Sequence, residues 1–169
     1  MSSKPRLHEM SMGDIGKKLL ARSELERFRD AHGRKRIVFT NGCFDLLHRG
    51  HVELLVKARS FGDLLVVGLN SDASVERLKG RPRPLVGEND RAYILLALEA
   101  VDEVTIFDED TPLETIMRLK PDVLVKGAEY DREGIVGANF VEEHGGRVER
   151  MPMVRGFSTT SLVEKIRKG

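Results

Sequence analysis

Five short strand-like runs alternate with helical patterns, and this alternation constrains the fold more than any other feature of the chain. The runs read RIVFT, LLVVGL, EVTIF, DVLVKG and RVERMP, at residues 36–40, 64–69, 103–107, 122–127 and 147–152. Between them the apolar residues recur at helical spacing, most clearly at 89–101. LLVVGL is apolar at even and odd positions alike, which is typical of a strand covered on both faces. The pattern predicts an α/β protein with a doubly wound, parallel five-stranded sheet and right-handed crossovers.

The chain of 169 residues has room for one domain with its own hydrophobic core. Residues 1–22 show no clear periodicity, so we predict a flexible N-terminal arm there, followed by a single domain at 23–169. The sequence SELE at 23–26 has the form of a capping box and predicts a short helix to about Ala31. Residues 75–87 hold two prolines and two glycines, which predicts a loop.

The charge balance argues against several classes of partner. The 28 basic and 27 acidic residues nearly cancel, so no global positive field favours nucleic acid or an anionic membrane. No apolar stretch is long enough to span a membrane, and the N-terminus lacks the apolar region of a secretory signal. These features predict a cytoplasmic protein. A local basic cluster (Arg77, Lys79, Arg81 and Arg83) suits a small anionic ligand.

Ligands of doubly wound sheets bind beyond the carboxyl ends of the strands, and the first such segment carries a dense polar motif, NGCFDLLHRGH at 41–51. His48 and His51 flank the expected start of a helix near Gly50, so both imidazoles can face one ligand above N–H groups that favour an anion. This arrangement suits a phosphate. Two structural histidines or a metal-binding pair are the open alternatives, although no further His or Cys stands at zinc-like spacing. Cys43 is expected to pack as a small apolar residue.

A second motif, GFSTTS at 156–161, leads directly into the last predicted helix. Ser158, Thr159 and Thr160 offer hydroxyl and N–H groups at that helix start, which by themselves indicate only a good N-cap. Since parallel strands end at the same edge of a sheet, this helix start and the two histidines are expected to meet. Together they predict a site that binds a polyphosphate from two sides.

The two motifs in combination resemble the cytidylyltransferase-like nucleotidyltransferases, whose signatures are His-x-Gly-His and a Ser-Thr-Thr motif before the last helix. The resemblance covers residues 35–167 and implies a Rossmann-like fold. The pieces VGLNSDASVERLKG, LALEAVDEV and PDVLVKGAEY look most like the adenylyltransferase domain of heptose-phosphate kinase/adenylyltransferases, which make ADP-heptose for lipopolysaccharide cores. MVRGFSTT, with Arg155 directly beside Gly156, favours this branch over the cytidylyltransferases of glycerol phosphate and choline phosphate.

The resemblance implies roles for individual residues. His48, His51 and Lys79 would be catalytic, with the histidines stabilising charge at the α-phosphorus and Lys79 neutralising phosphates. Besides the two histidines, the nucleotide would be bound by Thr40, Asn41, Gly42, Phe44, Gly50, Arg91, Lys126, Gly127, Glu129, Ser158, Thr159 and Thr160. The sugar phosphate would be bound by Asp45, Asn70 and Asp72.

The implied reaction joins AMP from ATP to D-glycero-D-manno-heptose 1-phosphate, with release of pyrophosphate, and gives ADP-heptose. Mg²⁺ is the expected cofactor, held mainly by the triphosphate and not by protein ligands. The resemblance also implies a homodimer and a separate sugar kinase upstream in the pathway. The alternatives are a cytidylyl- or guanylyltransferase acting on glycerol phosphate or another sugar or alditol phosphate, and a nucleotide-sensing module that has lost catalysis.

Overall fold

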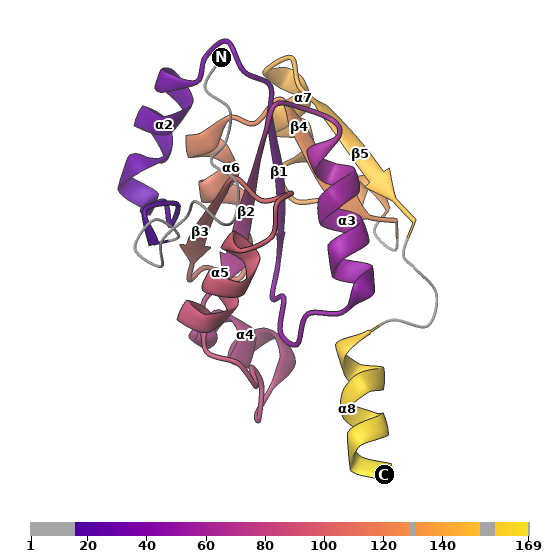
Figure 1. The fold of residues 1–169 in the computed structure, drawn as a ribbon. Helices are drawn as coiled ribbons and strands as arrows, with labels where there is room; N and C mark the ends of the chain where they lie inside the picture. The colour runs from indigo at the N-terminus through magenta and orange to yellow at the C-terminus, as the bar shows by residue number, and fades with distance from the viewer. Residues whose placement is uncertain (1–15, 129–130, 153–157, 169) are drawn as a thin grey trace.

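The computed structural model describes residues 16–128, 131–152 and 158–168, which form one parallel sheet with helices on both faces (Figure 1). The strands are β1 (Ile37–Gly42), β2 (Leu64–Asn70), β3 (Glu103–Phe107), β4 (Val123–Gly127) and β5 (Arg147–Met151). They lie in the order β3-β2-β1-β4-β5, and every neighbouring pair is parallel. The predicted doubly wound, five-stranded sheet is therefore confirmed. Glu129, Arg155 and Gly156 lie outside the described residues.

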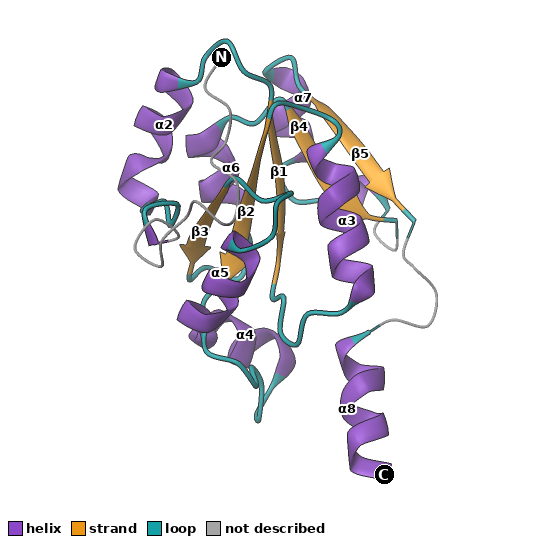
Figure 2. Cartoon of the chain, viewed as in Figure 1, coloured by secondary structure: helices purple, strands orange, loops and turns teal. Residues whose placement is uncertain are grey.

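Helices cover the two faces of the sheet in separate layers (Figure 2). The helices of one layer are α3 (Arg49–Arg59) and α5 (Glu88–Leu96), and those of the other are α2 (Leu25–Ala31), α6 (Leu113–Leu119) and α7 (Ala138–Glu143). Alternation along β1 serves both layers, because Val38 packs in the first core whereas Ile37 and Phe39 pack in the second. All three side chains are fully buried, which explains why the strand is apolar at successive positions.

The remaining described elements lie around the ends of the sheet. They are η2 (Arg22–Glu24), α4 (Asp72–Lys79), η3 (Arg132–Gly134) and α8 (Thr159–Lys168). No helix in the described parts of the chain is long and apolar enough to cross a membrane.

Helix α4 corrects the prediction that residues 75–87 are mostly loop. The Ser71 hydroxyl accepts a hydrogen bond from the backbone N–H of Ser74 at 3.0 Å and so caps the start of the helix. Gly80, with φ of 75°, ends it. The prolines that suggested a loop all follow Gly80, so only the α4–α5 loop (residues 80–87) lacks helical structure.

Two predicted boundaries also differ from the structure. The helix expected to reach Val101 ends at Leu96, because the chain then turns and the backbone N–H of Val101 donates to the carbonyl of Leu98 at 3.0 Å. The capping contact of η2 is made by Glu24, which accepts from the backbone N–H of Ala21 at 2.9 Å, and not by Ser23.

Part of the segment predicted as a flexible arm is paired with the sheet. The backbone N–H of Leu20 donates to the carbonyl of Val104 at 2.8 Å, and the N–H of Val104 donates to the carbonyl of Lys18 at 3.1 Å. Residues 18–20 therefore extend the sheet beside β3, and the ordered fold begins before the predicted boundary at residue 22.

The strand order creates an opening at the carboxyl end of the sheet. β1 pairs with β2 along its whole length, but its pairing with β4 stops at Phe39 and Leu124. Beyond that point the ends of β1 and β4 are no longer joined to each other. This is also where the strand order reverses, the place where ligands bind in doubly wound sheets. The fold thus predicts a cleft bordered by residues 40–42 and 125–127.

Gly68 gives a test of how closely this end of the sheet is packed. A Cβ at Gly68 would stand 2.6 Å from Cζ of the buried Phe39 ring, whereas a Cβ at Gly33 would meet nothing closer than 3.6 Å. We expect Gly68→Ala to lower the free energy of unfolding by about 1–3 kcal/mol, and Gly33→Ala to change it by less than about 0.5 kcal/mol. Urea unfolding measures both, and equal effects would contradict the packing.

Candidate active site

A cavity of about 520 Å³ opens where β1 and β4 separate. Most of the residues predicted for the site line it: Thr40, Asn41, Gly42, Phe44, Asp45, His48, His51, Asn70, Lys79, Lys126, Gly127, Ser158, Thr159 and Thr160. Three predicted residues, Gly50, Asp72 and Arg91, do not line it. The walls also include Arg83, which belongs to the predicted basic cluster, and residues that were not predicted: Cys43, Leu54, Leu78, Asp110, Thr111, Pro112, Gly134, Ile135 and Val136.

The two histidines stack on each other at the start of α3. Their ring centroids are 3.8 Å apart and the rings are inclined by 20°. His48 is the N-cap residue, with extended backbone, and its carbonyl accepts from the N–H of His51 at 3.0 Å. Phe44 packs against the His51 ring with centroids 5.3 Å apart. The helix start therefore presents both imidazoles to one cavity, as the motif predicted.

The surroundings of both imidazoles lower their pKa and so favour the neutral form in the free protein. Burial lowers the pKa of His51 to about 4, with a further contribution from the charge of His48, and burial also lowers the pKa of His48. A bound polyanion would reverse the balance of charge, because a negative partner stabilises the imidazolium form. The pair can thus act as neutral hydrogen-bond donors or take up a proton when an anion arrives.

Two buried polar atoms in the cavity wall have no hydrogen-bond partner among the described residues, namely Oδ1 of Asn41 and Nδ1 of His51. Leaving a buried polar atom unpaired costs on the order of 1–3 kcal/mol. Such exceptions are rare enough in folded proteins to need an explanation. A polar ligand in the cavity would satisfy both atoms.

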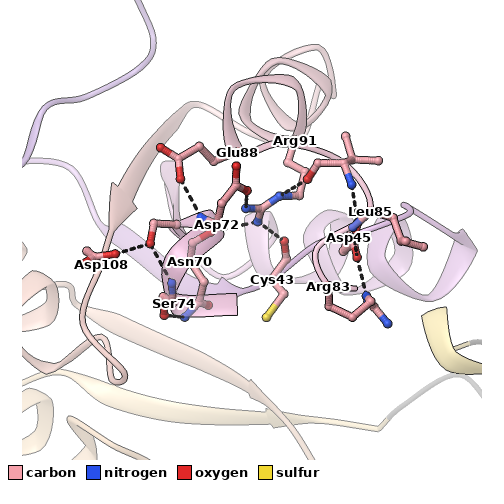
Figure 3. Close-up of polar contacts among 12 residues, drawn as sticks. Cys43, Asp45, Asn70, Asp72, Ser74, Arg83, Leu85, Glu88, Arg91 and Asp108 are labelled. Carbon is pink, nitrogen blue, oxygen red and sulfur yellow. Dashed lines mark hydrogen bonds and ion pairs between the residues drawn. The ribbon is translucent and has the colours of Figure 1, made fainter. Parts of the chain in front are cut away.

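The β1–α3 loop (residues 43–48) has a constrained backbone that centres on Asp45. Its neighbours Phe44 and Leu46 both have left-handed backbone, with φ of 46° and 53°. Such residues cost on the order of 1–3 kcal/mol each and persist only where surrounding contacts impose them. Here the contacts are those of Asp45, whose carboxylate is fully buried and accepts from Arg83 Nε at 2.6 Å and from the N–H groups of Leu85 and Val86. Asp45 therefore joins two loops (Figure 3).

Arg91 lies behind the cavity wall and is 1% exposed. Its guanidinium donates to four acceptors: the carbonyls of Val86, Cys43 and Asn70 at 2.8, 2.6 and 2.9 Å, and the carboxylate of Asp72 at 2.7 Å (Figure 3). These acceptors lie in three segments of the chain: the β1–α3 loop, the junction of β2 and α4, and the α4–α5 loop. Arg91 and Asp72 therefore bind each other. Neither lines the cavity, so this arrangement does not provide the direct contacts to nucleotide and sugar that were expected of them.

The start of α8 meets the first motif, as predicted for the two halves of the site. The hydroxyl of Thr159 donates to the carbonyl of Asp45 at 2.7 Å across 114 positions of sequence. Ser158 caps the helix through its hydroxyl, which accepts from the backbone N–H of Ser161 at 3.0 Å. In Figure 1 the beginning of α8 lies beside the β1–α3 loop. The Ser-Thr-Thr segment and the His-x-Gly-His segment thus border the same cavity.

The other predicted side chains differ in their surroundings. Asn70 is buried at the end of β2 and donates to the hydroxyl of Ser74 at 3.0 Å, while Lys79 and Lys126 reach the cavity from α4 and β4. Burial raises the pKa of the Cys43 thiol, although Lys79, Arg91 and Arg83 act in the opposite direction. The thiol is therefore protonated at neutral pH and is no activated nucleophile.

Two groups stand out among the residues that were not predicted. Asp110, Thr111 and Pro112 follow β3, and their position at a strand end was a usable signal. Gly134 ends η3, Ile135 and Val136 follow it, and no motif or strand end marks these residues. Only the path of the chain in space brings this second group to the cavity.

Comparisons with known proteins agree with the motifs. A model of the family described as cytidylyltransferase-like matches residues 39–166. The bifunctional protein HldE of Geotalea uraniireducens is 67% identical over 135 residues, which cover 80% of this chain and 28% of that protein. HldE of Syntrophotalea carbinolica is 56% identical over 164 residues, which cover 97% of this chain and 31% of that protein. The chain thus spans about a third or less of the length of these relatives.

Two solved structures are also similar. The lipopolysaccharide core biosynthesis protein from Thermoplasma volcanium has a TM-score of 0.59 and 28% identity, covering 71% of this chain and 97% of that one. Pantoate-beta-alanine ligase from Francisella tularensis, complexed with beta-gamma ATP and beta-alanine, has the same TM-score at 14% identity, covering 89% of this chain and 78% of that one. The second likeness shows the fold alone.

The geometry around Arg91 predicts a large stability effect. Arg91→Leu removes a buried guanidinium that donates to three carbonyls and to the half-exposed carboxylate of Asp72. Because buried acceptors are then left without donors, we expect the variant to lower the free energy of unfolding by about 3 kcal/mol. Arg49 is a matched control, because its pair with Glu53 is exposed. We expect Arg49→Ala to cost less than about 1 kcal/mol. Similar losses for both variants in urea unfolding would refute the assigned role.

The depressed pKa of His51 predicts how stability depends on pH. The unfolded chain, with the ordinary histidine value of 6.5, binds the proton more tightly than the folded protein, with a pKa of about 4. The contribution of His51 is therefore fully present above pH 6.5 and is lost as the pH falls from 6.5 to 4. NMR titration of the free protein should give a His51 midpoint near 4. A midpoint at or above 6.5 would contradict the buried, stacked geometry.

Proposed function

The chain belongs to the cytidylyltransferase-like family, and from this premise we propose that it transfers AMP from ATP to a heptose 1-phosphate, releasing pyrophosphate and forming ADP-heptose. One observation carries the proposal. His48 and His51 at the start of α3 and Thr159 at the start of α8 border one cavity, and Thr159 is hydrogen-bonded to the loop that bears the histidines. Two helix N-termini with imidazole and hydroxyl donors suit a polyphosphate.

The comparisons support the heptose branch that the sequence motifs indicate. The HldE proteins are 56% and 67% identical to this chain, and the Thermoplasma protein is by its title a lipopolysaccharide core biosynthesis protein. The relatives are about three times as long as this chain, so their other activities are not transferred to it. The homodimer and the separate kinase stay predictions.

The proposed chemistry is a direct, in-line displacement at the α-phosphorus of ATP. An oxygen of the sugar 1-phosphate forms a bond to that phosphorus while the bond to the bridging oxygen of the β-phosphate breaks, and pyrophosphate leaves. The nucleophile is already an anion at neutral pH, so no strong general base is needed. Catalysis is therefore positioning of the reactants and stabilisation of the charge on the phosphates.

The residues that line the cavity have different roles in this proposal. His48 and His51 would donate hydrogen bonds to phosphate oxygens from one helix start, and Ser158, Thr159 and Thr160 would do so from the other. Lys79 adds a positive charge at the end of α4. Lys126 and Gly127, on the β4 side, would border the base and ribose, while Thr40, Asn41 and Gly42 form the floor at the end of β1.

Mg²⁺ enters the proposal as a counter-ion of the triphosphate. The described residues contain no cluster of three side chains able to bind a metal. The two carboxylates that line the cavity, Asp45 and Asp110, are paired with Arg83 and Arg77. These residues do not fit a metal site built by the protein, and no step of the proposed chemistry is assigned to them as metal ligands.

Removing either histidine tests the proposal. Loss of one preorganised donor to a charged transition state costs on the order of 10²–10³ in rate, so we expect His48→Ala and His51→Ala to lower turnover by at least that factor with the fold intact. His144→Ala is the control, because His144 is exposed at the end of α7. Pyrophosphate release with ATP and heptose 1-phosphate measures all three. Wild-type turnover in both cavity variants would refute the mechanism.

The same assay separates the proposed reaction from its alternatives. ATP, CTP and GTP are each combined with heptose 1-phosphate, other sugar 1-phosphates and glycerol phosphate. We expect the highest kcat/KM with ATP and heptose 1-phosphate. A preference for CTP or GTP, or for glycerol phosphate, would assign the chain to another branch. Tight ATP binding without pyrophosphate release from any pair would indicate a nucleotide-sensing module.

A further inference from the structure

The basic cluster of residues 77–83 is divided by the structure into two kinds of side chain. Arg77 and Arg81 do not line the cavity and are exposed, whereas Lys79 and Arg83 line it. Arg77 binds Asp110 at 2.8 Å and the carbonyl of Asp108, and Arg81 binds Glu76. Basic residues that lie close together in the sequence therefore have different surroundings in the structure.

Arg83 has a position that the other arginines of this cluster lack. Its side chain is 19% exposed, it lies at the wall of the cavity, and its Nε donates to the fully buried carboxylate of Asp45 at 2.6 Å (Figure 3). Within residues 16–128, 131–152 and 158–168, Asp45 is the only hydrogen-bonding partner of the Arg83 side chain. The contact uses the Nε position and leaves the two terminal nitrogens without a protein acceptor in that part of the chain.

A guanidinium held in this way is suited to a phosphate. It is planar, permanently charged, and presents parallel N–H groups that match two phosphate oxygens. The contact with Asp45 fixes the plane of the group before a ligand arrives, which reduces the conformational entropy lost on binding. Asp45 is itself held by the backbone N–H groups of Leu85 and Val86, so it does not depend on Arg83 for its place.

We infer that Arg83 binds a phosphate group of one of the two substrates and that Asp45 is the positioning residue that orients it. The inference deepens the proposed function and rests on it for the identity of the substrates. It assigns Arg83 to the site and gives Asp45 an indirect role in place of the direct sugar contact expected from the sequence. The phosphate belongs either to the nucleotide or to the sugar 1-phosphate, and separate KM values distinguish the two.

The matched pair Arg83→Ala and Arg81→Ala tests the inference. Both variants remove an arginine from the same loop, two positions apart, but only Arg83 lines the cavity. We expect Arg83→Ala to raise KM for one substrate on the order of 10- to 100-fold, the value of a charged hydrogen-bonded contact, with a smaller change in kcat. Arg81→Ala should leave both KM values unchanged. If the two variants share the same KM values, the inference is wrong.

A double-variant comparison tests the role of Asp45. Asp45→Asn keeps the side-chain volume and one carbonyl oxygen but removes the charge that orients Arg83. If Asp45 acts through Arg83, it should raise KM for the same substrate, and Asp45→Asn combined with Arg83→Ala should be no worse than Arg83→Ala alone. Additive losses in KM would mean that Asp45 contacts substrate directly. Circular dichroism melting identifies variants that have lost the fold. If the Asp45 variants do not fold, the KM values of Arg83→Ala decide the inference.

A direct binding measurement separates failure of this inference from failure of the proposed function. If wild-type protein gives no turnover with any substrate pair, the proposed function fails, and inorganic pyrophosphate is then titrated calorimetrically into wild type, Arg83→Ala and Arg81→Ala. Binding that is weakened at least 10-fold in Arg83→Ala alone supports an anion site at Arg83. Equal binding by the three proteins would overturn it.

Discussion

One buried guanidinium, that of Arg91, joins the segments from which the cavity is built. Its acceptors lie in the β1–α3 loop, at the end of β2, at the start of α4 and in the α4–α5 loop. A charge taken out of water in this way is tolerated only when it is well hydrogen-bonded, and four of the five N–H groups of Arg91 have acceptors. These contacts hold the segments in a single arrangement. The buried carboxylate of Asp45, in the β1–α3 loop, is also well hydrogen-bonded. It accepts from Arg83 and from the backbone N–H groups of Leu85 and Val86. The wall of the site is therefore organised before any ligand binds, which is the condition for electrostatic catalysis.

Much of the architecture could be predicted because it depends on local patterns. Strands such as β2 are apolar at successive positions because both faces are covered, and the order of strands and helices then leaves few topologies open. His48 and His51 were predicted together because three positions at a helix start place two side chains on one ligand. Thr159 was predicted because all parallel strands end at one edge. Each of these predictions needs only the sequence spacing and a general rule of α/β folds.

What could not be predicted depends on distant acceptors. Nothing in the sequence around Arg91 indicates that the carbonyls of Cys43 and Asn70 would surround it, so the resemblance alone decided the expectation that it binds the nucleotide. Arg81 and Arg83 lie two positions apart in the same basic run, and only the buried carboxylate of Asp45 distinguishes them. Gly134 to Val136 reach the cavity through the course of the chain after β4. Helix α4 was missed because the prolines that follow it obscured its end.

Helix α8 has no fully buried side chain, and its first residue is hydrogen-bonded to the β1–α3 loop. The hydrogen bond from Thr159 to the carbonyl of Asp45 links them, and one such bond is worth about 1 kcal/mol net, which corresponds to a population ratio of only roughly fivefold. That bond therefore adds only modestly to the free energy that holds α8 against the loop. A phosphate bound at both helix starts would add its own contacts to this bond. Binding of such a ligand would then strengthen the contact between α8 and the β1–α3 loop.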